Sequence, residues 1–94
     1  MSTSQEIYID DNEFLNEIEL HEYFADVLQF PTYYGNTYAS FSDCLEDIYH
    51  DVHIIFTCNE QPSNWIKPFI DIAMRISHMH PSLIVDVSYG ADRH

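Results

Sequence analysis

The sequence predicts an α/β domain in which a three-stranded parallel sheet packs with three or four helices. Three short segments have the composition of strands, and helical periods of apolar residues separate them. Strands separated by helices favour parallel pairing through right-handed crossovers. A chain of 94 residues is also too short to support two cores. We therefore expect one domain over residues 1–94, with flexible ends at about 1–5 and 90–94.

The predicted strands are short, apolar and rich in β-branched residues. The first, EIYID, alternates Ile7 and Ile9 with Tyr8, which is typical of a half-buried strand. The other two are the continuous runs HIIFT, residues 53–57, and LIVDV, residues 83–87. Together these runs predict the three strands of the sheet.

Two helices follow from apolar positions that recur with helical spacing. The first carries Leu20, Phe24, Val27 and Leu28. It should end at Phe30-Pro31, because a residue before proline is pushed out of the helical conformation. The later helix carries Phe69, Ile72, Ala73 and Ile76. We expect it to begin near Ser63 or Asn64 and to finish before His80-Pro81.

A further helix is predicted from Tyr38 onward, with Asn36 or Thr37 as its N-cap. At about 100° per residue, its apolar side collects Phe41, Leu45 and Ile48, flanked by Tyr38 and Cys44. The opposite side collects Ala39, Ser42, Asp43 and Glu46. We therefore expect the carboxylate of Asp43 to point outward among small neighbours.

The strongest global signal is charge. Sixteen Asp and Glu residues against three Lys and Arg residues give a formal net charge of −13. Such a field repels nucleic acid and anionic membranes and attracts basic partners, so binding of RNA, DNA or a membrane is not expected. The simpler alternative is an organism whose proteins are acidic throughout. The undiminished content of large apolar residues argues against that alternative.

The cysteines and the N-terminus bear on the compartment. Cys44 and Cys58 are too few for the disulfide framework of a small secreted protein, so both are interpreted as free thiols. The first residues, MSTSQEIYIDD, lack the basic start and apolar run of a signal peptide, and no segment approaches a membrane span. We expect a cytoplasmic protein, and we favour a monomer.

The segment FPTYYGNTYASFSDCL, residues 30–45, resembles the central segment of the barstar family, intracellular inhibitors of the ribonuclease barnase. Seven residues match at the family's spacing: Pro31, Tyr33, Tyr34, Gly35, Asp43, Cys44 and Leu45. Phe30 and Phe41 are apolar replacements. The resemblance implies a barstar-like fold whose central loop and helix plug a ribonuclease active site.

The resemblance and the helical spacing together indicate a set of target-binding residues: Tyr33, Gly35, Thr37, Tyr38, Ala39, Ser42, Asp43 and, from the spacing alone, Glu46. Tyr33, Gly35 and Asp43 keep the family's residue types. Four positions depart from them, because Thr37 replaces Asn, Tyr38 replaces Leu, Ala39 replaces Asp and Ser42 replaces Trp. An acidic contact of the family falls at or near Arg75, where the sign is reversed, and Glu46 could restore part of the missing charge.

The resemblance gives these residues roles in inhibition. A ribonuclease cleft gathers cations to bind phosphate, so Asp43 would take the place of the phosphate through charge-assisted hydrogen bonds. Tyr33 would supply a rigid aromatic contact, and Gly35 would allow close approach of backbone. The other acids would speed association with a basic enzyme. The predicted partner is therefore a basic ribonuclease or ribonuclease toxin.

Other interpretations stay open. The same fold could bind a different basic protein or a toxin that is not a ribonuclease. Tyr33, Tyr34 and Gly35 could be turn and packing residues, and Asp43 an ordinary solvated charge. A hydrolase or nuclease lacks support, because the sequence shows no nucleophile motif, phosphate loop or basic surface. The histidine pairs 78/80 and 50/53 are weak metal signals, so we predict no metal, no cofactor and no catalytic residue.

Overall fold

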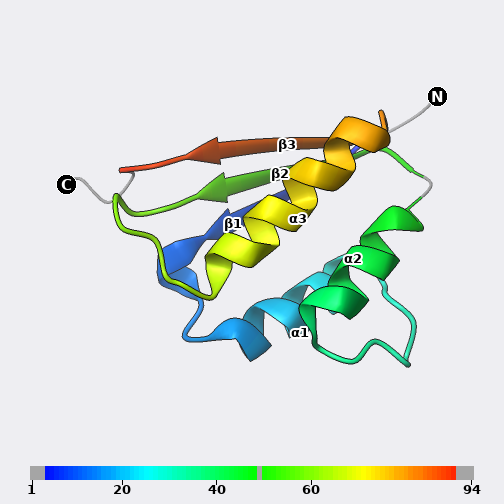
Figure 1. Ribbon diagram of the computed structural model, residues 1–94, viewed down its shortest axis with the longest axis horizontal. Coiled ribbons are helices and arrows are strands. Elements are labelled where there is room, and N and C mark those ends of the chain that lie inside the picture. Colours follow the sequence, from blue (N-terminus) through cyan, green and yellow to red (C-terminus); the bar gives the residue numbers. More distant parts are fainter. Residues whose placement is uncertain (1–3, 49, 91–94) are drawn as a thin grey trace.

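The computed structural model describes residues 4–48 and 50–90 and has the predicted α/β architecture, with three parallel strands and three α-helices (Figure 1). In chain order the elements are β1 (Gln5–Asp10), the 3-10 turn η1 (Asp11–Glu13), α1 (Glu17–Val27), α2 (Tyr38–Glu46), β2 (Val52–Thr57), α3 (Ile66–Met79) and β3 (Leu83–Ser88). Each predicted strand and each predicted helix is present.

The sheet has the order β1-β2-β3, and both pairings are parallel. Its register aligns Ile7 with Ile54 and Ile54 with Val85. Right-handed crossovers between strands in this order bring all the helices to one face, and Figure 1 shows α3 lying across the sheet with α1 and α2 beside it. Ile7, Ile9 and Ile54 are buried on that face.

The core forms where one phenylalanine from each helix meets. Phe24 of α1, Phe41 of α2 and Phe69 of α3 are fully buried, with ring centroids 4.8 Å (Phe24–Phe41), 5.0 Å (Phe41–Phe69) and 5.7 Å (Phe24–Phe69) apart. Phe24 also lies 6.5 Å from Phe56 of β2. Such ring pairs contribute beyond simple area burial. The three helices and the sheet therefore share one aromatic cluster, which fixes α2 to the scaffold.

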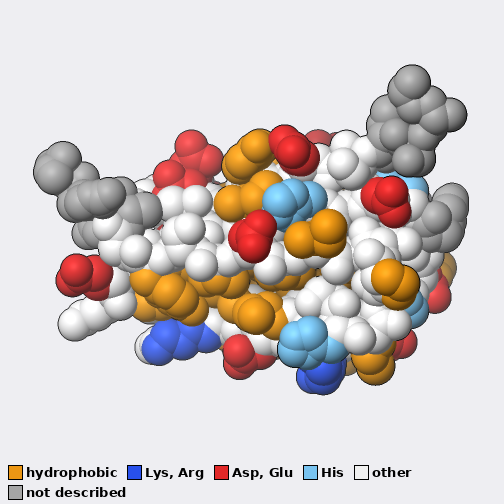
Figure 2. Space-filling model, turned by 90° about the horizontal axis from the view of Figure 1, so that it is seen from above, with side chains coloured by type: hydrophobic (Ala, Val, Ile, Leu, Met, Phe, Trp, Pro, Cys, Tyr) orange, Lys and Arg blue, Asp and Glu red, His pale blue; other side chains and the backbone are white. Residues whose placement is uncertain are grey.

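The other face of the sheet is more open. Tyr8 of β1 is 61% exposed and Ile84 of β3 is 54% exposed. His53 of β2 and Asp86 of β3 lie on the same face, where His53 Nε2 and Asp86 Oδ2 form a hydrogen bond of 2.6 Å. Seen from above the sheet, hydrophobic, acidic and histidine side chains lie intermixed (Figure 2).

The structure differs from the sequence-based expectations in detail. Helix α3 begins at Ile66, later than Ser63 or Asn64, because a turn over residues 64–65 precedes it and the Ile66 amide donates to the Ser63 carbonyl. Residues 58–65 hold no helix, so the helix count is the lower of the two expected. Gln5, assigned to a flexible end, is the first residue of β1, whereas residues 1–3 and 91–94 lie outside the described residues.

One long-range contact holds the turn before α3. The buried carboxylate of Asp11, directly after β1, accepts a hydrogen bond of 3.1 Å from the Ser63 amide.

Among the described helices, none combines the length and hydropathy of a membrane-spanning segment.

Candidate functional site

The loop between α1 and α2 begins with a sharp helix ending. Gln29 has a φ of 55°, in the left-handed region, and its amide donates to the Asp26 carbonyl at 3.3 Å. The Phe30 amide then reaches back to the Ala25 carbonyl at 3.0 Å. These two bonds form a Schellman motif, which usually places glycine at the left-handed position. Helix α1 thus ends at Val27 with Leu28 as its C-cap, earlier than the ending expected at Phe30-Pro31, because the Schellman motif at Gln29 already turns the chain toward the loop.

The next turn places two adjacent tyrosines on opposite sides. The Tyr34 amide donates to the Pro31 carbonyl at 3.0 Å, so Tyr33 lies at a corner of the turn. Tyr33 is 79% exposed, whereas Tyr34 is half-buried and its ring lies 4.9 Å from that of Phe30. Tyr33 can therefore contact a partner while Tyr34 anchors the loop.

A fully buried histidine holds Tyr34 from below. The Nδ1 atom of His21 hydrogen-bonds to the Tyr34 hydroxyl, and its Nε2 atom lies 3.3 Å from Glu17 Oε2. This pattern fits a neutral imidazole with its proton on Nε2, donating to Glu17 and accepting from Tyr34. Burial lowers the pKa of His21, which Glu17 partly offsets, and burial raises the pKa of Tyr34. Both groups therefore keep these protonation states at neutral pH.

Helix α2 begins with a complete N-cap. Thr37 Oγ1 accepts from the Ser40 amide at 3.1 Å, which satisfies one of the free amides of the first turn. Of the two N-cap candidates, Thr37 is therefore correct. Asn36, just before it, has a φ of 56° and supplies the left-handed residue of the loop. A Cβ on Gly35 would lie 3.3 Å from Ser40 Oγ, so the absence of a side chain there lets the loop approach the helix closely.

The two sides of α2 lie as the helical spacing predicts. Phe41 and Leu45 are buried in the core, and Ile48 packs against it half-buried. On the opposite side, three of the four expected residues are exposed: Ala39, Asp43 and Glu46. Ser42, the fourth, is half-buried because α3 approaches it.

Two candidate residues make contacts to α3 and its entry. Tyr38 is half-buried, its hydroxyl donates to the Trp65 carbonyl at 2.8 Å, and its ring lies 5.2 Å from that of Phe69. Ser42 Oγ accepts a hydrogen bond of 3.3 Å from Nη2 of Arg75. Arg75 is exposed, so its guanidinium lies at the edge of the outward side of α2.

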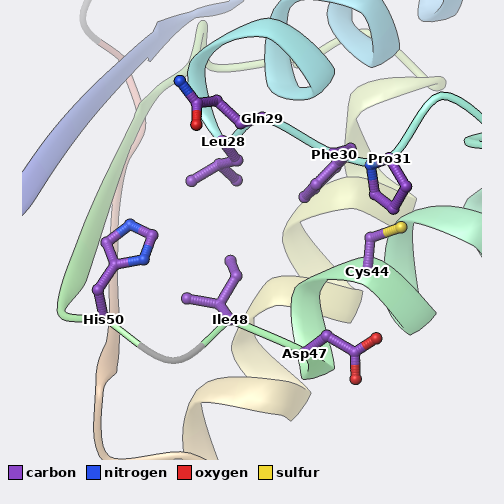
Figure 3. Close-up of a pocket in the computed structure, with 8 residues that line it drawn as sticks. All are labelled: Leu28, Gln29, Phe30, Pro31, Cys44, Asp47, Ile48 and His50. Atoms are coloured by element: carbon purple, nitrogen blue, oxygen red, sulfur yellow. The ribbon is translucent and has the colours of Figure 1, made fainter.

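A cavity of about 350 Å³ lies behind the loop, between the ends of α1 and α2 (Figure 3). Its lining residues are Leu28, Gln29, Phe30, Pro31, Cys44, Asp47, Ile48 and His50.

The two cysteine thiols are not activated for chemistry. The pKa of the Cys44 thiol is raised by burial, Asp47 and Asp43. Burial and the nearby Asp11 and Asp10 raise the pKa of Cys58 to about 11. Both thiols therefore stay protonated near neutral pH and are poor nucleophiles.

Within residues 4–48 and 50–90, no group of three or more His, Cys, Asp or Glu residues is arranged to hold a metal ion. The histidine pairs noted in the sequence thus form no such group in the described chain. The geometry offers instead an exposed loop and an exposed helix side, both anchored from behind. That arrangement is suited to contact with another macromolecule.

A comparison with protein families gives a match that includes this surface. The family model described as Barstar (barnase inhibitor) matches residues 4–61, more than half of the 94 residues. The chain belongs to the barstar family. A comparison with curated proteins found no match. The matched barstar segment runs from β1 through β2 and includes the loop and α2, whereas α3 and Arg75 lie beyond it.

Within this barstar-family chain, sequence reasoning missed two contacts of the surface. His21 was not singled out, although it falls between Leu20 and Phe24 on the buried stripe of α1, where a polar side chain needs a partner. The contact between Arg75 and Ser42 had no local signal, because 33 residues separate the two.

Proposed function

We propose that this barstar-family chain is an inhibitor that caps the active site of a basic ribonuclease, as a single cytoplasmic domain in the cell that makes the enzyme. The loop from Tyr33 to Thr37 and the outward side of α2 would enter the cleft. The family's description as barnase inhibitors supports this proposal. The protein would act by binding and would catalyse nothing itself.

The observation that carries the proposal is that residues 33–46 include both exposed side chains and side chains that anchor the segment to the core. Tyr33, Asp43 and Glu46 are exposed, whereas Tyr34, Phe41 and Leu45 hold the same segment to the core. A surface held in this way loses little conformational freedom on binding. An exposed carboxylate on a rigid helix suits a cleft that binds phosphate, because it can receive charge-assisted hydrogen bonds.

The decisive variant is Asp43→Ala. It should leave folding intact and weaken binding to the target by about 2 to 5 kcal/mol, because the cations of the cleft would be left without a partner. The matched control is Asp71→Ala, which removes the same charge from an exposed position of α3 beside Lys67 and Tyr89. Calorimetric titration with the ribonuclease measures both variants, and equal affinities for wild type and Asp43→Ala would refute the role.

The target itself can be sought by capture from the producing cell on the immobilised protein, followed by a ribonuclease assay of the captured fraction. The proposal expects ribonuclease activity that the free protein suppresses and that Asp43→Ala suppresses poorly. A captured basic protein without ribonuclease activity would favour the second candidate, a binding module for another basic protein or toxin. The contact between Arg75 and Ser42 supports this second candidate, because Arg75 adds a cation to the surface.

A further inference from the structure

The outward side of α2 carries a positive charge that comes from a different helix. Arg75 lies on α3, and its Nη2 atom donates to Ser42 Oγ at 3.3 Å. Ser42 precedes Asp43 and lies one helical turn from Ala39 and from Glu46. The surface is therefore dipolar, with carboxylates and a guanidinium side by side.

Most of the hydrogen-bonding capacity of Arg75 remains available to a partner. A guanidinium has five N–H donors in a planar fork. The structure gives Arg75 one side-chain hydrogen bond, and no carboxylate in residues 4–48 or 50–90 pairs with it within 4.0 Å. Because Arg75 is exposed, its other donors face solvent in the free protein. Burial against a partner would require an acceptor for them.

We propose that Arg75 determines target specificity: the partner presents a carboxylate opposite Arg75, next to the cations that receive Asp43. This inference rests on the proposed function. A cleft lined only with cations would attract Asp43 but repel Arg75, and a buried guanidinium without an acceptor weakens a complex. A carboxylate there would receive the paired N–H donors of the guanidinium. Arg75 therefore selects against ribonucleases whose clefts are uniformly basic.

Lys67 provides a matched control on the same helix. It is exposed, lies two turns before Arg75 on α3, and lines a hollow with Pro62, Ile70, Asp71 and Tyr89. Lys67→Glu and Arg75→Glu change the net charge equally, so any general gain in attraction to a basic enzyme is common to both. Figure 2 shows the blue side chains as separate groups along one edge of the molecule.

The experiment measures binding of barnase, as a probe with a phosphate-binding cleft, to wild type, Arg75→Gln, Arg75→Glu and Lys67→Glu. Arg75→Glu should bind barnase at least about tenfold more tightly than wild type, because repulsion is replaced by attraction. Arg75→Gln should fall between them. Lys67→Glu should change affinity by less than about threefold, mainly through the association rate.

A second arm replaces the cleft Lys and Arg residues of barnase by Glu, one at a time. Wild type should gain affinity for at least one of these barnase variants, and Arg75→Glu should lose affinity for the same one. Equal gains from Arg75→Glu and Lys67→Glu would overturn the inference, as would the absence of any barnase variant preferred by wild type. Undetectable binding of barnase to Arg75→Glu would also overturn the inference, because the inference attributes the weaker binding of barnase by wild type to Arg75.

These failures leave the proposed function separately testable. If the wild-type protein suppresses the captured ribonuclease and Asp43→Ala does not, inhibition stands even though Arg75 does not select the target. If neither barnase nor the captured protein is inhibited, the proposed function fails as well.

Discussion

At the scale of single residues, the loop depends on two neighbouring tyrosines that face in opposite directions. Tyr33 is free to meet a partner, and Tyr34 reaches His21 and Phe30 beneath the loop. Hydrogen bonds to buried polar groups are costly to lose, because the unpaired group stays desolvated. His21 therefore positions the loop although it would touch no target.

The environment of His21 predicts a pH dependence of stability. The groups that face it are Glu17 on its own helix, Tyr34 of the loop, Tyr38 of α2 and Phe69 of α3. Burial lowers the pKa of His21 from its ordinary value of 6.5, so the unfolded chain binds this proton better than the folded one. The resulting stability is complete above the ordinary pKa and declines as the pH falls below it.

Replacement of His21 by Gln tests this dependence, because glutamine can still hydrogen-bond to Tyr34 but does not titrate. Urea unfolding at about pH 7.5 and about pH 5.5 should show a larger loss of stability for wild type than for His21→Gln. The two proteins share the remaining histidines and carboxylates, which cancel in the difference. An identical loss in both would mean that His21 is not the group responsible.

At the scale of elements, α2 depends on its N-cap as well as on its buried side. Thr37→Ala removes the bond to the Ser40 amide and should lower the free energy of unfolding by about 1 kcal/mol. Urea unfolding measures the effect. Because the cap also shapes the junction between loop and helix, we expect weaker target binding at constant concentration of folded protein.

The control for this prediction is Thr32→Ala in the same loop. Thr32 is exposed in the turn that follows Pro31 and caps no helix. Its replacement should change stability by less than about 0.5 kcal/mol. A comparable loss from both variants would show that general loop perturbation, and not the N-cap, sets the stability of α2.

At the scale of the whole molecule, a net charge of −13 opposes the compact state through self-repulsion. Added NaCl should therefore raise the midpoint of thermal unfolding, most steeply below about 0.15 M, where screening strengthens fastest. Scanning calorimetry over a salt series measures the trend. Stabilisation by exclusion of salt from the surface would instead grow at high concentration, so a flat response below about 0.15 M would contradict the charge account.

Much of this molecule is determined locally and could be predicted from the sequence. The strands over residues 5–10, 52–57 and 83–88 follow from short apolar runs, because the β-branched and aromatic residues in such runs favour the extended conformation of a strand. The two sides of α2 follow from its 3.6-residue period, which alone separates Phe41 and Leu45 from Asp43 and Glu46. The family resemblance of residues 30–45 agrees with the family match over residues 4–61.

Only the tertiary structure decided which distant side chains meet at this surface. The sequence placed Ser42 on the outward side of α2, but the packing of α3 half-buries it and brings Arg75 within 3.3 Å. In the same way, α1 brings His21 beneath Tyr34. The physical reason is that helical periodicity fixes which side of a helix is apolar, whereas the crossing of two helices sets the contacts between their edges.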